Sequence, residues 1–302
     1  MPRHPNNFKS NTVILACSQG INHYFALLTQ AVKCTLLITA GLFFLLLGEA
    51  FAESDIQKGH ETEDGDLVDI VLSDWDFTLG AGAGVSPDYE GSDDYEIGFL
   101  PVVEASWRDD TFFISSDMGI GATLLRSEHF RAGLSINHDG GRDEDDNNAL
   151  RGLGDVDGGI VGTAFAELDL GQYALGVDIT QDLSGNDKGT LAYFSADYRF
   201  SVWDDKLMFG LGPEISWASA DYTETYFGVN AQQASRSKYN QFDADAGFKD
   251  AGLHLNAMYV VDENWALAGG VGYARLLGDA ADSPIVKSKN QFFSGLSLSY
   301  SF

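Results

Sequence analysis

From Trp75 to the C-terminus, apolar residues alternate with small or polar residues in separate runs, with polar connections between the runs. A period of two is typical of a strand whose two faces meet different surroundings. The last run, 290–302, predicts an outward face and an inward face. The outward face holds Phe292, Ser294, Leu296, Leu298, Tyr300 and Phe302, and the inward face holds Phe293, Gly295, Ser297, Ser299 and Ser301. An apolar face ending on an aromatic residue is typical of a strand in an outer-membrane barrel.

Twelve runs carry this pattern. They are 75–87, 95–107, 111–115, 118–125, 129–138, 159–168, 172–183, 189–202, 207–218, 248–261, 265–276 and 290–302. Most have the length of a tilted membrane crossing, which takes roughly 9–11 residues. The runs 111–115 and 118–125 are short, and an alternative with ten strands treats 111–125 as an irregular excursion.

The connections alternate between short and long. The short ones are 108–110, 126–128, 169–171, 203–205 and 262–264, and the long ones are 88–94, 139–158, 184–188, 219–247 and 278–289. Bacterial barrels keep short turns on the periplasmic side and long loops outside. The sequence therefore predicts an all-β protein, a closed antiparallel transmembrane β-barrel of twelve strands with both termini periplasmic.

Tryptophan placement favours the same fold. All five tryptophans fall at strand ends or in a short turn, four of them on the predicted periplasmic side: Trp75, Trp107, Trp203, Trp217 and Trp265. Aromatic girdles at both membrane interfaces have this distribution.

The N-terminal region predicts export. An apolar run at 35–48 follows Lys33 and precedes Ala50-Phe51-Ala52, the small-x-small pattern of a signal peptidase site. We expect residues 1–52 to be a signal peptide cleaved between Ala52 and Glu53. The run is shorter than the roughly 20 residues of a spanning helix. Because the segment before Lys33 is long for a signal peptide, translation starting at Val32 is a further hypothesis.

The net charge limits the classes of binding partner, and the cysteine positions limit the chemistry of the mature chain. The net charge of −27 excludes nucleic acid, because a phosphate backbone would repel the chain. Both cysteines, Cys17 and Cys34, lie in the predicted signal peptide. Residues 53–74 are strongly acidic and predict a solvated periplasmic strap before the barrel at 75–302.

The inward faces of the predicted strands are small and polar and carry charge. Two arginines are expected in the lumen among carboxylates: Arg131 and Arg199, with Glu104, Glu167, Asp197 and Glu214. Other inward positions include Asp178, Thr180, Asp182, Asp250, His254 and Asn256. Two interpretations stay open, namely ion pairs that brace the wall and a selectivity filter.

No pattern predicts catalysis, a cofactor or a metal. Beyond the signal peptide the histidines are His60, His129, His138 and His254, and no Gly-x-Ser-x-Gly elbow occurs. The acidic stretches 142–146 and 155–158 lack EF-hand spacing. They predict solvated, self-repelling loops, or loose divalent-cation bridges to lipopolysaccharide phosphates.

Several loop motifs resemble the MipA/OmpV family of outer-membrane proteins. The motifs are Gly141-Arg142, Leu150-Arg151-Gly152-Leu153-Gly154-Asp155-Val156-Asp157, Tyr226-Phe227-Gly228-Val229, Gln233-Ala234-Ser235-Arg236-Ser237, Ala246-Gly247-Phe248-Lys249-Asp250 and Tyr273-Ala274-Arg275-Leu276-Leu277-Gly278-Asp279-Ala280-Ala281-Asp282-Ser283-Pro284-Ile285-Val286. The resemblance runs from about Trp75 to Phe302 and implies a place in the bacterial outer membrane.

The resemblance also implies a function. MipA members are described as scaffolds that hold a murein lytic transglycosylase together with a murein synthase, and OmpV members as surface antigens with adhesin or porin-like roles. We therefore expect a scaffold, with a narrow diffusion channel or a surface adhesin as alternatives. The family brings no shared catalytic residues, and its loop motifs could bind a partner or fold back over the pore.

Overall fold

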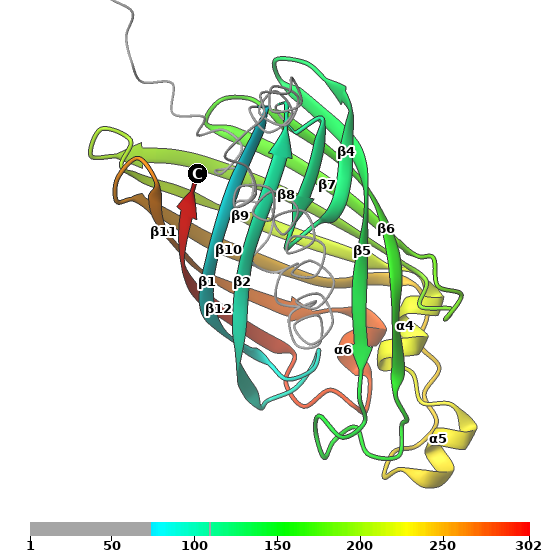
Figure 1. The fold of residues 1–302 in the computed structure, drawn as a ribbon. Coiled ribbons are helices and arrows are strands. Elements are labelled where there is room, and N and C mark those ends of the chain that lie inside the picture. The colour runs from blue at the N-terminus through cyan, green and yellow to red at the C-terminus, as the bar shows by residue number, and fades with distance from the viewer. Residues whose placement is uncertain (1–73, 109) are drawn as a thin grey trace, which may run out of the picture.

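Twelve antiparallel strands close into one barrel in the computed structural model, which describes residues 74–108 and 110–302 (Figure 1). The strands are β1 (Trp75–Pro87), β2 (Tyr95–Trp107), β3 (Phe112–Ser115), β4 (Gly119–Arg126), β5 (Phe130–Arg142), β6 (Val156–Asp169), β7 (Tyr173–Asp182), β8 (Thr190–Val202), β9 (Leu207–Ala218), β10 (Gly247–Val260), β11 (Trp265–Leu276) and β12 (Asn290–Ser301). Each strand pairs with its sequence neighbours, and β1 pairs with β12, with Thr78 opposite Ser301. Because β3 pairs with β2 only from Glu104 to Trp107, the earlier part of β2 has its strand partner on the β1 side alone within the described residues.

The twelve-strand prediction is confirmed and the ten-strand alternative is wrong. The short strands β3 and β4 form a hairpin whose outer sides pair with β2 and β5. The predicted signal peptide, its cleavage site after Ala52, a start at Val32 and the strap up to residue 73 lie outside the described residues.

Two strands are longer than predicted. β5 continues to Arg142 and β6 begins at Val156, so the connection between them is 143–155 rather than 139–158. Gly141 lies opposite Asp157 in the extra ribbon, where its φ of +76° suits a residue without a side chain. A ribbon beyond the lipid needs no apolar face, so this part of each strand carries no alternation that the sequence could reveal.

The two faces of the wall differ as predicted. On β12, Phe292, Leu296 and Leu298 are exposed on the outside, whereas Gln291 and Ser299 are buried toward the lumen. Large apolar side chains are likewise exposed along the other strands, among them Ile97, Leu134, Leu175, Leu253 and Val271. An apolar outer skin around a polar interior is the arrangement that lipid requires.

One bulge changes which side chains enter the lumen. The register of β9 and β10 shifts between Phe248 and Asp250, so Lys249 is buried, although strict alternation from the inward-facing Asp250 would turn it outward. A bulge adds one residue to one strand and redirects its side chain. This is why Lys249 was not among the predicted lumen residues.

The two ends of the barrel are unlike. At the short-turn end, where the chain ends at Phe302, Trp75 begins β1, Trp107 ends β2 and Trp203 lies in the β8–β9 turn. The opposite, long-loop end carries the helices (Figure 1). The predicted placement of the tryptophans at strand ends is confirmed.

Three helices occupy the long connections in the described part of the chain: α4 (Ala220–Phe227), α5 (Ala231–Arg236) and α6 (Gly278–Asp282). The side chain of Ser219 caps α4, and Asn230 with Gln233 forms a capping box at α5. None of the helices in residues 74–108 and 110–302 is long and apolar enough to cross a membrane.

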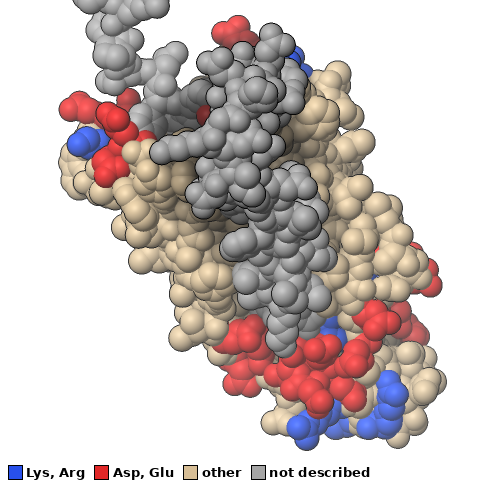
Figure 2. Space-filling model, viewed as in Figure 1, with Lys and Arg blue, Asp and Glu red and all other residues tan. Residues whose placement is uncertain are grey.

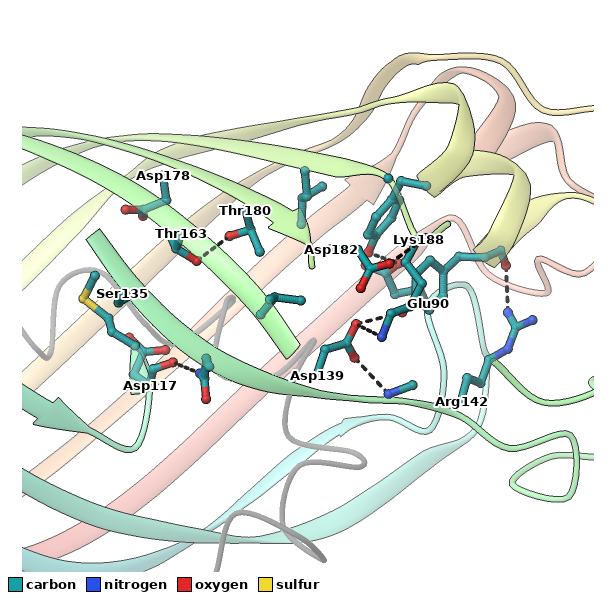
Figure 3. Close-up of a pocket in the computed structure, with 18 of the residues that line it drawn as sticks. Glu90, Asp117, Ser135, Asp139, Arg142, Thr163, Asp178, Thr180, Asp182 and Lys188 are labelled. Carbon is teal, nitrogen blue, oxygen red and sulfur yellow. Dashed lines mark hydrogen bonds and ion pairs between the residues drawn. The ribbon is translucent and has the colours of Figure 1, made fainter. Parts of the chain in front are cut away.

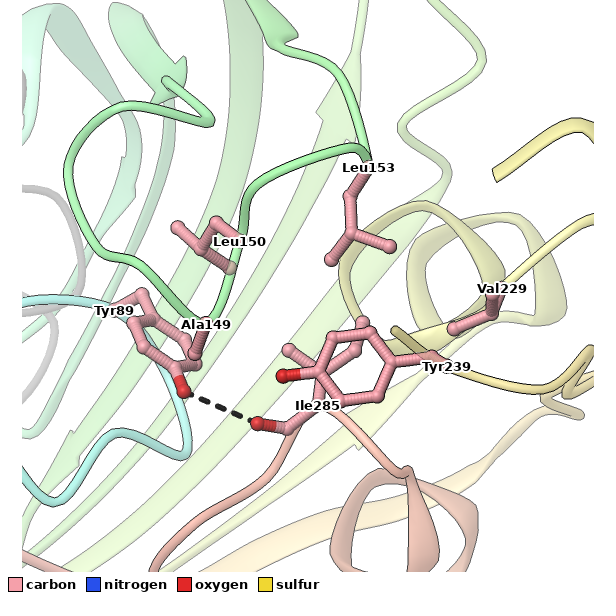
Figure 4. Packing of buried hydrophobic residues seen from close by; sticks show 7 residues of the cluster. All are labelled: Tyr89, Ala149, Leu150, Leu153, Val229, Tyr239 and Ile285. Carbon is pink, nitrogen blue, oxygen red and sulfur yellow. Dashed lines mark hydrogen bonds between the residues drawn. The ribbon is translucent and has the colours of Figure 1, made fainter. Parts of the chain in front are cut away.

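The long connections also hold a hydrophobic core of their own (Figure 4). Its buried residues come from four separate connections: Tyr89, Ala149, Leu150, Leu153, Val229, Tyr239 and Ile285. A second cluster joins Phe227 to Leu276, Ala280 and Ala281. We call the folded connections 88–94, 143–155, 219–246 and 277–289 the cap. Its apolar core corrects the prediction that these connections are merely polar loops.

Candidate functional site: the capped lumen

Helix α4 bridges distant parts of the wall at the mouth of the lumen. The Tyr222 hydroxyl donates to Oε2 of Glu90 at 3.3 Å, and the Tyr226 hydroxyl donates to Oδ2 of Asp139 at 3.2 Å. Glu90 belongs to the β1–β2 connection and Asp139 to β5, whereas α4 follows β9. These strands are four or more positions apart around the barrel. The helix therefore reaches across the mouth.

Both tyrosines are suited to this role as donors. Burial and the negative charge of Glu90 raise the pKa of Tyr222 well above its ordinary value. Burial and the charge of Asp139 do the same to the pKa of Tyr226. Both phenols thus keep their protons at neutral pH, as a hydrogen bond to a carboxylate requires.

Cations complete the contacts around α4. Nζ of Lys188, in the β7–β8 connection, lies 2.9 Å from Oδ2 of Asp139. Nζ of Lys249 pairs with Glu90 and lies 2.9 Å from Oδ2 of Asp250. Glu90 and Asp139 accept the hydrogen bonds of the α4 tyrosines, and each also pairs with a lysine from another part of the barrel.

The acidic connection between β5 and β6 is ordered by its own carboxylates. Oε2 of Glu144 accepts the backbone N–H groups of Gly152 and Gly154 at 2.9 and 2.8 Å. Nε of Arg236, in α5, donates to the carbonyl oxygen of Gly152 at 2.7 Å, where an added Cβ would lie 2.5 Å from the Arg236 carbonyl oxygen. Asp155 accepts the N–H of Glu144. Backbone donors thus engage Glu144 and Asp155, whereas Asp143 and Asp145 are exposed to solvent.

A cavity of about 110 Å³ lies beneath α4, inside the lumen (Figure 3). Strands β5, β6 and β7 contribute Ser135, Thr163, Asp178 and Thr180, and the β3–β4 turn contributes Asp117. Drug-sized ligand sites occupy about 300–1,000 Å³, so this cavity suits only a small molecule.

Charged side chains inside the lumen form ion pairs between neighbouring strands. Arg131 and Arg199 share Glu167, with nitrogen-to-oxygen distances of 3.5 and 3.1 Å. Arg131 also lies 3.3 Å from Oδ2 of Asp110, and Ser115 donates to Glu104. The prediction that both arginines face the lumen among carboxylates is confirmed.

His254 is the centre of a second buried cluster. Its Nε2 lies 2.7 Å from Oδ1 of Asp197, and its Nδ1 lies 3.2 Å from Oε2 of Glu214, which also accepts from the Tyr193 hydroxyl. The hydrogen-bond partners are carboxylates rather than a serine hydroxyl, so the arrangement is that of a wall-bracing ion pair. His129 lies in the short turn between β4 and β5.

The sequence missed the residues that build the mouth. Glu90, Lys188 and Tyr222 lie in connections, where no periodicity indicates direction. The sequence did carry one signal that these connections fold. Large apolar residues such as Leu150 and Ile285 lie inside otherwise polar loops, and a purely solvated loop would not need them.

Charge is concentrated at the ends of the molecule. Figure 2 shows acidic side chains gathered at the long-loop end, whereas the visible strand surface is largely uncharged. A charge-poor band between charged ends matches a wall set in a bilayer.

A closed barrel with an apolar outer skin, a polar lumen and a folded loop cap defines an outer-membrane β-barrel protein. The chain belongs to the family described as MltA-interacting protein MipA, whose model matches residues 79–302. Its place in the outer membrane follows from the fold and from its relatives.

Two curated relatives are outer-membrane proteins of Vibrio species. The chain is 29% identical to outer membrane protein Omp26La of Vibrio anguillarum over 169 residues, and 28% identical to outer membrane protein OmpV of Vibrio cholerae over 164 residues. Each match covers 53% of this chain and 61% of the relative.

Solved barrels resemble the fold at low sequence identity. A bacterial polysaccharide outer membrane secretin is 8% identical with a TM-score of 0.43, and the match covers 74% of this chain and 98% of that chain. OprB of Pseudomonas putida is 10% identical with a TM-score of 0.41, covering 79% and 97%.

Proposed function

We propose that this protein is a scaffold of the outer membrane that holds murein-remodelling enzymes, a lytic transglycosylase of the MltA kind together with a murein synthase. The observation that supports this function best is the cap. Tyr222 and Tyr226 lie across the mouth of the lumen, and they pack against the second hydrophobic cluster of the connections. A barrel closed in this way is poorly suited to steady diffusion and well suited to anchoring.

The family description supports the choice of partner. The family is named for interaction with MltA. The short-turn end, which we assign to the periplasm, is the end where murein enzymes work. The acidic segment 53–74 is a further candidate contact for these enzymes, because it directly precedes the barrel in the sequence.

The direct test is capture of a purified MltA-type lytic transglycosylase by the detergent-solubilised mature chain on a sensor surface. We expect saturable binding, and a ternary complex when the murein synthase is added. Deleting residues 53–74 tests the strap, with a Gly/Ser segment of equal length as the matched control. Loss of binding in both the deletion variant and the Gly/Ser variant assigns the contact to the strap. Unchanged binding in both variants assigns it to the short turns. Absence of capture by the unmodified chain refutes the scaffold.

A narrow channel is the second candidate, because a polar cavity lies in the lumen beneath the cap. Planar-bilayer recording separates the two functions. The scaffold predicts silence or rare brief openings, whereas the channel predicts a steady conductance.

A further inference from the structure

Two carboxylates in the lumen cavity differ from the rest of its lining. Six acidic side chains and two basic ones line the cavity: Asp88, Glu90, Asp117, Asp139, Asp178 and Asp182, with Arg142 and Lys188. Four of the six have polar partners, since Asn147 donates to Asp88, Tyr222 to Glu90, Lys188 to Asp139, and the Ser184 N–H to Asp182. Asp117 and Asp178 are the two that remain.

These two side chains are buried and unpartnered. Asp117 and Asp178 are each 8% exposed, and Ser135 is 4% exposed. Within the described residues, Oδ1 of Asp117, Oδ1 of Asp178 and Oγ of Ser135 are buried atoms without a hydrogen-bond partner. Arg131 attracts Asp178 electrostatically, but its guanidinium is bonded to Asp110 and Glu167. Buried polar atoms that stay unsatisfied cost free energy, so their convergence on one cavity calls for a ligand.

The three groups come from three separate elements. Asp117 lies in the turn between β3 and β4, Ser135 on β5 and Asp178 on β7, and Figure 3 shows all three at one end of the cavity. Met118 and Val161 line the same cavity and add apolar surface. The site thus combines two carboxyl groups, a hydroxyl acceptor and a short apolar wall.

We propose that this cavity binds a small primary ammonium ion, a protonated alkylamine, with Asp117, Asp178 and Ser135 accepting its hydrogen bonds. A primary ammonium carries three N–H donors, which matches three acceptors on different elements. Its single positive charge balances one ionised carboxylate, the other carboxyl still offers an oxygen acceptor, and its alkyl chain contacts Met118 and Val161. A cavity of about 110 Å³ limits the ligand to a short chain.

The same groups suit a divalent metal less well. Magnesium demands near-octahedral oxygen coordination, and calcium takes six to eight oxygen ligands. In the part of the chain that the structure describes, no group of three or more histidine, cysteine or acidic residues is placed to hold a metal ion. This proposal does not depend on the scaffold function.

The test is isothermal titration of the folded barrel in detergent at pH 7 with n-butylammonium chloride. Butan-1-ol serves as the uncharged probe of the same length, and magnesium chloride as the metal. We expect saturable binding of one n-butylammonium per barrel, with no saturable binding of butan-1-ol or magnesium. Asp117→Asn and Asp178→Asn each weaken binding by about tenfold or more, because each removes a charge-assisted hydrogen bond.

Matched variants separate the site from general charge effects. Asp143→Asn removes an exposed carboxylate of the cap that does not line the cavity, and it leaves binding unchanged. Heat-modifiable migration on gels checks that each variant folds, and the unmodified protein tests the proposal even where a variant fails. The proposal is overturned by no saturable n-butylammonium binding, by equal affinity for butan-1-ol or magnesium, or by unchanged affinity in both folded Asp→Asn variants.

Discussion

Nη1 of Arg142 donates a hydrogen bond to the backbone carbonyl oxygen of Tyr226 at 2.7 Å. The guanidinium carbon lies 5.9 Å from the centre of the Tyr226 ring, and the Arg142 side chain is buried. This contact joins the last residue of β5 to helix α4, and it also joins two of the motifs by which the sequence resembles its family. The motifs thus fold the connections back over the lumen, one of the two roles that the sequence left open.

Replacing this arginine should loosen α4. Arg142→Ala removes a charged donor from the Tyr226 carbonyl, and hydrogen bonds to charged groups contribute about 1.5–3 kcal/mol. We expect the open fraction of the cap to rise about tenfold to hundredfold, since 1.4 kcal/mol is tenfold in an equilibrium constant. Planar-bilayer recording should show more frequent openings, and limited proteolysis should cut 219–246 faster.

Arg151→Ala is the matched control, because Arg151 is an exposed arginine of the same cap. It should leave both openings and proteolysis unchanged. Equal behaviour of the two variants would mean that the Arg142 contact does not hold the cap.

The cap core should be sensitive to loss of volume. Leu150 is fully buried among residues of the four connections, and a buried Leu→Ala change costs about 2–5 kcal/mol. We expect Leu150→Ala to raise amide hydrogen exchange throughout the cap while leaving the barrel strands protected. Leu170→Ala, at an exposed position in a short turn, should change hydrogen exchange neither in the cap nor in the barrel strands. Protection of the cap equal to that of the unmodified protein would contradict a cooperatively folded cap.

The barrel could be predicted from the sequence because its wall separates lipid from water. Each strand then repeats the same two-residue alternation, and strands such as β2 and β11 begin and end as predicted. The predicted inward positions of Arg131 and His254 follow from the same alternation, and both residues lie in ion-pair clusters.

The cap could not be predicted in the same way, because its contacts join residues far apart in the sequence. Tyr89 contacts Ile285 through a hydrogen bond of 3.1 Å across 196 positions, and neither residue lies in a periodic run. Lys249 escaped prediction because a bulge breaks the alternation at its position. The helix caps at Ser219 and Asn230 were local signals that could have indicated α4 and α5.

The β10–β11 turn should depend on pH through Asp262. Oδ1 of Asp262 accepts the backbone N–H groups of Asn264 and Trp265 at 2.9 and 2.8 Å, and these bonds lower the pKa of Asp262 below its ordinary 3.8. Because the folded-state pKa is lowered, the ionised group stabilises the fold above the unfolded pKa, and this contribution is lost as pH falls through the folded value.

The measurement is the free energy of unfolding against pH for three proteins. The difference between the unmodified chain and Asp262→Asn should shrink as the pH falls below about 4. The difference between Asp262→Asn and Asp262→Ala should stay flat, since neither carries a titrating group at this position. A carbon NMR titration of the Asp262 carboxyl that gives a pKa at or above 3.8 would contradict the assignment.

The His254 cluster should contribute strongly to barrel stability. His254→Leu fills the same space but leaves Asp197 and Glu214 buried without their imidazole partner, and removing one member of a buried ion pair costs about 3–5 kcal/mol. We expect that loss in urea unfolding from lipid vesicles. His129→Leu, at an exposed histidine in a short turn, should cost little. Adding Asp197→Asn to His254→Leu should recover part of the loss, because the uncompensated charge is then gone. If His254→Leu unfolds with the same free energy as the unmodified protein, the cluster does not brace the wall.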